Sequence, residues 1–107
     1  MAAFDIKDTL SGMLGAIKGE TGDGWKKVKA VAEQFAASNE KRLKMIADLR
    51  ISGEMDDTDF EKAMNDEKEM LEAQMNAISV ISKAVVQKAV NAAFGVFWKA
   101  VMAAVPF

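Results

Sequence analysis

The C-terminal third of the chain is the feature that most restricts how this sequence can fold. From residue 75 to residue 107 there is no acidic side chain and there are only three lysines, set among many Val, Ile, Ala and Phe residues. Between Thr58 and Pro106 the sequence has no proline and one glycine, Gly95, so no strong helix breaker is present. The sequence therefore predicts one long helix over residues 59–104 that begins among acidic residues and ends as an almost wholly apolar rod.

Two shorter helical patterns precede this rod. The first covers about residues 3–18 and repeats its apolar residues with the period of a helix. Those residues are Phe4, Ile6, Leu10, Met13, Leu14 and Ile17. A glycine-rich joint at residues 19–24 follows, and Asp23 is then placed to cap a second helix over residues 25–51. The first helix is thus short and amphipathic, and the second is longer.

A turn at residues 52–58 joins the second helix to the rod. Gly53 is expected in the left-handed conformation after a helix end, and Thr58 with Glu61 fits a capping box for the next helix. A turn this short makes its flanking helices antiparallel neighbours. The prediction is one all-α domain, residues 1–107: a short N-terminal amphipathic helix plus a long antiparallel helical hairpin with an extended apolar C-terminal helix.

The charges of the two hairpin arms are opposite in sign. Residues 25–50 carry seven basic and three acidic side chains, whereas residues 54–72 carry two basic and nine acidic ones. The predicted partners are Arg50 with Asp57 or Asp59, and Lys41, Arg42 and Lys44 with Asp66, Glu67 and Glu69. Each exposed pair contributes only about 0–1 kcal/mol, but together the pairs would select the register. Two independently solvated faces are the alternative.

The rod is longer than the helix that would cover it. Pairing with the second helix ends near residue 80 and leaves about 25 residues, roughly 38 Å of helix, without cover. We therefore predict a non-enzymatic structural protein that forms a homo-oligomer through this rod. The predicted self-association residues are Ala89, Val90, Ala93, Phe94, Phe97 and Val101. In the alternative of a compact monomer, the first helix would cover most of the rod.

A membrane-active or membrane-anchored protein is the competing class. In that alternative, residues 84–107 insert into a bilayer, as in a pore former or a peripheral anchor. Lys99 would cost about 2.5–3.5 kcal/mol near the middle of a single lipid-facing span. Candidate contacts to lipid or to an acidic partner are Lys26, Lys27, Lys29, Trp98 and Lys99. An adaptor that binds a helix of another protein is a third class.

The sequence does not favour an enzyme. Histidine, cysteine and tyrosine are all absent, which removes most of the usual acid–base groups and nucleophiles. Asp57, Asp59 and Glu61 begin like a calcium loop, but Lys62 occupies its sixth position and Lys68 its twelfth. We expect no catalytic residue, no metal, no cofactor and no small-molecule substrate.

Net charge and the first residues bear on partners and compartment. The net charge of −2 does not favour a nucleic-acid partner. Asp5 and Asp8 stand where a secretory signal would have lysines and an apolar run, so no cleavable signal is expected. The compartment is left open.

Methionine is frequent, with eight residues. Met45, Met64 and Met75 fall at the spacing of core positions. We therefore expect them to fill the core rather than to line a peptide-binding groove.

Overall fold

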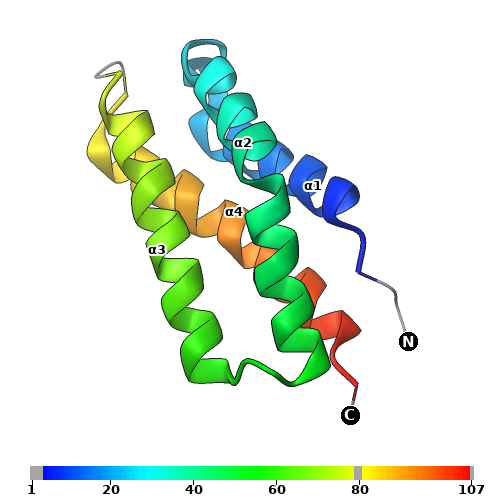
Figure 1. Ribbon diagram of the computed structural model, residues 1–107. Helices are drawn as coiled ribbons and strands as arrows, with labels where there is room; N and C mark the ends of the chain where they lie inside the picture. The colour runs from blue at the N-terminus through cyan, green and yellow to red at the C-terminus, as the bar shows by residue number, and fades with distance from the viewer. Residues whose placement is uncertain (1–3, 79–80, 107) are drawn as a thin grey trace.

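The computed structural model describes residues 4–78 and 81–106, and within them the chain is all-α, as predicted. Its elements are α1 (Ile6–Thr21), the 3₁₀ turn η1 (Gly22–Gly24), α2 (Trp25–Ser52), α3 (Asp57–Asn76) and α4 (Lys83–Ala104). In Figure 1, α2 and α3 lie side by side in front, and α4 crosses behind them toward α1. The predicted first-helix start at Ala3 and residues 79 and 80 of the predicted rod lie outside the described residues, as does residue 107 of the alternative membrane-inserting segment.

The start of α1 is capped, but the start of α2 is not. The Asp5 carboxylate accepts hydrogen bonds from the backbone N–H groups of Lys7 and Asp8. The predicted Asp23 cap of α2 is wrong, because Gly24 precedes α2 in a helical conformation and no side chain caps it. The 3₁₀ turn keeps the backbone helical up to Trp25, so the extended conformation that a capping residue needs never occurs.

The connection between α2 and α3 contains one correct prediction and one wrong one. Gly53 has φ 85° and ψ 3°, the predicted left-handed conformation, and its N–H donates to the carbonyl of Arg50. Thr58, however, lies inside α3 and is not its cap. Asp56 takes that role, because its backbone is extended and its carboxylate accepts from Asp59 N–H at 2.8 Å.

The predicted unbroken helix over residues 59–104 is wrong. α3 ends at Asn76, and α4 begins only at Lys83. Ser82 has an extended backbone, and its hydroxyl accepts a hydrogen bond from Val85 N–H at 3.2 Å. Serine competes for backbone hydrogen bonds and favours helix caps, and β-branched residues are weaker helix formers. The β-branched Ile78 and Ile81 and the capping Ser82 therefore favour a break that the absence of proline and glycine did not indicate.

This break lets α4 turn back into the molecule. α4 packs most extensively against α1 and also contacts α3 and α2. A Cβ atom placed on Gly12 of α1 would lie 3.1 Å from Val96 Cγ1 of α4, so the two helices approach closely there. The result is a bundle of 42 × 22 × 21 Å in which no apolar overhang of 38 Å exists.

Phenylalanine rings from α2, α3, α4 and the N-terminal segment meet in the core. Phe97 stacks on Phe60 with ring centroids 5.9 Å apart, and it makes edge contacts with Phe4 and Phe94. Phe94 in turn contacts Phe35 of α2 at 6.4 Å. These contacts hold α4 between α1 on one side and α2 and α3 on the other. The opposite sides of α2 and α3 are therefore exposed to solvent.

Candidate protein-interaction face

Two ion pairs connect α2 and α3. Arg50 Nη2 lies 2.7 Å from Asp57 Oδ1 near the connecting turn. Arg42 Nε lies 2.5 Å from Glu67 Oε1 near the middle of both helices. These two contacts fix the register of α2 against α3, with residue 42 beside residue 67.

The other residues predicted to pair across the two arms lie elsewhere. Lys44 Nζ bonds Asp48 on its own helix at 2.8 Å, since these residues are one helical turn apart. Lys41, Asp59, Asp66 and Glu69 are exposed. The structure therefore brings together Arg42 with Glu67 and Arg50 with Asp57, and leaves the other five predicted side chains exposed on the surface.

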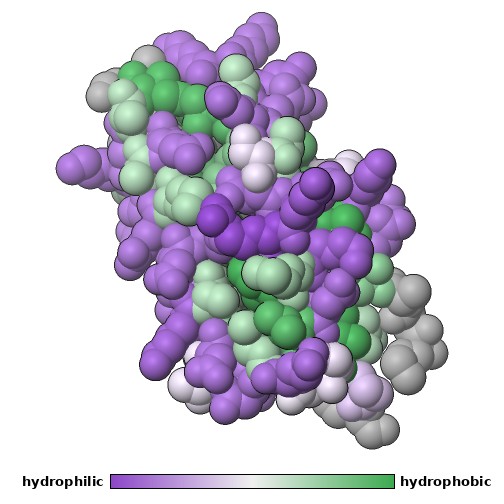
Figure 2. Space-filling model, viewed as in Figure 1, coloured by the Kyte–Doolittle hydropathy of each residue, from purple (hydrophilic) through white to green (hydrophobic). Residues whose placement is uncertain are grey.

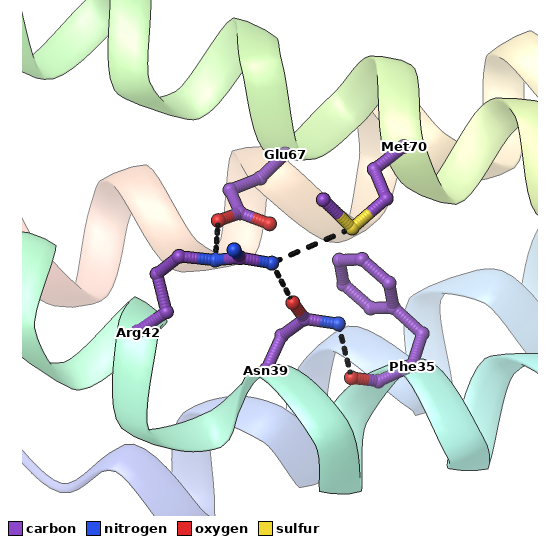
Figure 3. A network of polar contacts seen from close by, with 5 residues as sticks. All are labelled: Phe35, Asn39, Arg42, Glu67 and Met70. Carbon is purple, nitrogen blue, oxygen red and sulfur yellow. Dashed lines mark hydrogen bonds and ion pairs between the residues drawn. The ribbon is translucent and has the colours of Figure 1, made fainter.

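A polar cluster surrounds the pair at the middle of the two helices (Figure 3). Arg42 Nη2 donates to Asn39 Oδ1 and to Met70 Sδ, and the Asn39 amide donates to the carbonyl of Phe35 at 2.9 Å. Asn39 is buried although it is polar. A polar residue at a core position of a helix is a sequence signal that could have indicated this cluster, but nothing in the sequence identified Met70 as a member.

Glu67 is the unusual member of the cluster. Its side chain is 4 % exposed, whereas that of Arg42 is 47 % exposed. Its Oε2 atom is buried without a hydrogen-bond partner among the described residues. Burial raises the pKa of the Glu67 carboxyl because desolvation outweighs the attraction of Arg42. The ion-pair partner of this buried carboxylate is therefore an arginine that is itself partly exposed to solvent.

Two hollows flank this cluster on the outward surface of α2 and α3. The upper hollow, of about 310 Å³, is lined by Val31, Gln34, Phe35, Ser38, Asn39, Gln74 and Ala77. The lower hollow, of about 260 Å³, is lined by Arg42, Met45, Ile46, Ala63, Asp66, Glu67 and Met70. Figure 2 shows this side of the molecule, with a hydrophilic band across its middle and hydrophobic side chains above and below. We call this surface, with both hollows, the α2–α3 face.

Met45 is the most exposed large apolar side chain of this face. It is 54 % exposed and stands at the rim of the lower hollow. Met64 and Met75 are buried as predicted, but the core position predicted for Met45 is wrong. The helical period placed Met45 near the apolar stripe of α2, yet α2 turns this residue outward beside α3.

The residues predicted to form a self-association interface on the rod lie inside a single chain. Ala89, Val90, Ala93, Phe94, Phe97 and Val101 are each at most 1 % exposed. The premise that one copy cannot cover them is therefore wrong, because α4 folds back onto α1 and behind α2 and α3. In this fold these six side chains offer no surface to a second copy.

The candidate lipid contacts fall at opposite ends of the molecule. Lys26, Lys27 and Lys29 lie at the start of α2, whereas Trp98 and Lys99 lie toward the end of α4 (Figure 1). Trp98 is 36 % exposed and rests against Phe60, with ring centroids 5.6 Å apart. The structure therefore does not unite these five residues into one basic and aromatic patch.

Comparisons with known proteins give no assignment. No protein-family model, curated protein or solved structure matches this chain. Within residues 4–78 and 81–106, no helix is both long and apolar enough to cross a membrane. Across the same described residues, no group of three acidic side chains is placed to hold a metal ion. Function is therefore inferred from the geometry and charge of the chain itself.

Proposed function

We propose that this chain is a non-enzymatic assembly protein that associates with copies of itself through the α2–α3 face. In this proposal α2 and α3 act together as an antiparallel hairpin that forms the outward, associating layer. The earlier prediction of self-association is kept, but its site moves from the buried rod to this face.

The exposed Met45 beside the lower hollow is the observation that carries the proposal. Together with Ile46, Ala63 and Met70, which line the same hollow, Met45 forms an apolar group on the surface, and contiguous exposed apolar groups are typical of interaction sites. Burying a fully exposed methionine side chain contributes about 1.5–3 kcal/mol. Met45 is 54 % exposed, so the two Met45 side chains of a dimer contribute about that much together, enough to change an association constant at least tenfold. The walls of the lower hollow, Ala63 and Met70, are small or flexible, so they can accept a long, unbranched side chain.

The charges of the face support a second copy as the partner. α2 carries seven basic and three acidic side chains, and α3 carries two basic and seven acidic ones. A surface with adjoining positive and negative halves is complementary to itself when two copies meet about a two-fold axis. The bundle is 42 Å long and 22 Å wide, large enough to provide the roughly 800 Å² per partner of a standard interface.

The test is the solution mass of the full chain, measured by light scattering and sedimentation over a range of concentrations in detergent-free buffer. We expect a multiple of 11.6 kDa, and we expect salt to weaken association because it screens exposed charges. Met45→Asp is expected to lower the mass to that of one chain. Gln87→Asp is the matched control, since it adds the same charge to an exposed position of α4. A monomer of the unaltered chain at every concentration would refute the proposal.

A further inference from the structure

The outward sides of α2 and α3 carry rows of exposed residues that complement each other. Those of α2 recur every three or four residues: Ala37, Lys41, Met45 and Asp48. Those of α3 have the same spacing: Lys62, Asp66, Glu69 and Ala73. Residues spaced in this way share one side of a helix, so each set forms a continuous row. We call them the α2 row and the α3 row.

The two rows can be compared by the position of each residue along the axes of the paired helices, which we call its level. Arg42 pairs with Glu67, and Arg50 pairs with Asp57, so the end of α2 lies at the level of the start of α3. On this scale Lys41 of the α2 row is level with Asp66 and Glu69 of the α3 row. Asp48, which already pairs with Lys44 on its own helix, lies between the levels of Asp59 and Lys62. Lys41 therefore has two opposite charges near its own level in the other row.

The small residues and Met45 fit the same comparison. Ala37 is level with Ala73, so two short side chains would face each other and allow the helices to approach closely. Met45 is level with Ala63 and Asp66, which line the lower hollow. Charge at Lys41 and side-chain size at Ala37 and Met45 thus agree with one register of the two helices.

From this match we infer how two copies meet, on the basis of the function proposed above. The two-fold axis runs parallel to α2, so that the α2 row of each copy lies on the α3 row of the other. A rotation about such an axis exchanges the sides of the face and keeps every residue at its own level. Met45 of each copy then enters the lower hollow of the other, and the four helices form an interface with neighbours of opposite charge.

The other symmetric arrangement is disfavoured by charge. An axis perpendicular to the helices would place α2 on α2 and α3 on α3. α2 has a net charge of +4 and α3 of −5, so that arrangement would bring like charges together, which is unfavourable. The match between rows would also be lost, because Lys41 would no longer face Asp66 and Glu69.

Charge reversal tests this arrangement. Lys41→Glu, and separately Asp66→Lys with Glu69→Lys, should each weaken self-association at least tenfold. Mixed in equal amounts, the two variants should form a mixed dimer with at least tenfold tighter association than either alone, because both exchanged contacts are again attractive. Lys88→Glu on exposed α4 is the control and should leave the mass unchanged. Circular dichroism and thermal melts establish that each variant is folded.

The outcomes separate this inference from the proposed function. A monomeric unaltered chain would overturn both. An unaltered chain that self-associates, with no loss on Lys41→Glu or no recovery on mixing, would overturn this arrangement and leave self-association standing. Recovery on mixing, with the Lys88→Glu control unchanged, would support it.

Discussion

Gly12 of α1 lies so close to Val96 of α4 that a Cβ atom at position 12 would come within 3.1 Å of Val96 Cγ1. This approach holds the apolar C-terminal helix against the N-terminal helix and removes its surface from water. By contrast, a Cβ atom on Gly15, one turn further along α1, would meet nothing within 4 Å. The two glycines therefore have different roles in the same helix.

Substitution of these glycines should change stability in opposite directions. Gly12→Leu should lower the free energy of unfolding by about 1–3 kcal/mol, because the larger side chain overfills the contact with Val96. Gly15→Ala should raise it by roughly 0.5–1 kcal/mol, because alanine restricts the unfolded chain and has the higher helix propensity. Urea unfolding of both variants measures the difference. Equal effects at the two positions would show that α1 and α4 do not approach at Gly12.

Acidic substitutions in α4 should unfold the chain rather than dissociate an oligomer. Phe94→Asp combined with Val101→Asp places two carboxylates where both side chains are at most 1 % exposed. A large ring lost from a core costs about 3–5 kcal/mol, and buried unpaired charge adds to this cost. Far-ultraviolet circular dichroism should show loss of helix. A folded monomer would instead support the rod as an exposed interface.

Removing Arg42 should destabilise the fold more than removing Lys44. Arg42→Ala leaves the Glu67 carboxylate, 4 % exposed, without its ion pair, and an unsatisfied buried polar group costs roughly 1–3 kcal/mol. Lys44→Ala removes only the exposed pair with Asp48, so its effect should be about 0–1 kcal/mol. Chemical denaturation compares the two variants. Similar losses would mean that Glu67 finds another partner or water.

Glu67 should make stability depend on pH in a definite direction. Burial raises the pKa of its carboxyl above the ordinary value of 4.5, with Arg42 opposing the shift and Asp66 adding to it. The folded chain therefore binds more protons than the unfolded chain between those two pKa values. The contribution of Glu67 to the free energy of unfolding is fully present below the unfolded pKa and is lost as pH rises through the folded pKa.

Glu67→Gln removes this dependence, because the glutamine side chain does not titrate. The variant should gain stability relative to the unaltered chain as the pH rises from about 4 to about 7. Urea unfolding at several pH values across that range measures the difference. A constant or shrinking advantage would contradict a raised pKa for Glu67.

The break before α4 predicts a helix cap at Ser82 and none at Thr58. Ser82→Ala should cost about 1 kcal/mol, because Val85 N–H loses the hydroxyl that accepts its hydrogen bond. Thr58→Ala, at an exposed position inside α3, should stay within about 0.5 kcal/mol. Thermal melts of the pair provide the measurement. The reverse order would favour the sequence-based assignment of the caps.

The helical period indicated which residues of α3 face the core, even where the helix boundaries were wrong. Phe60, Met64, Leu71 and Met75 recur at the helical period in the sequence of the predicted rod, and all are buried. Phe94 of α4 follows the same spacing, but it was predicted in a self-association interface and is instead buried within one chain. A stripe of this kind depends only on local spacing, so it is unaffected by a break between residues 77 and 82.

By itself, the amino-acid sequence determined the helical class, the left-handed Gly53 and the opposite charges of α2 and α3, because helix propensity, turn geometry and charge act over short distances along the chain. Only the tertiary structure decided that α4 turns back at Ser82 and lies against Gly12, and that Met45 stays outside. Those outcomes depend on contacts between residues far apart in the chain, where burial of α4 against α1 outweighs the small local preference for continuing a helix through residues 77–82.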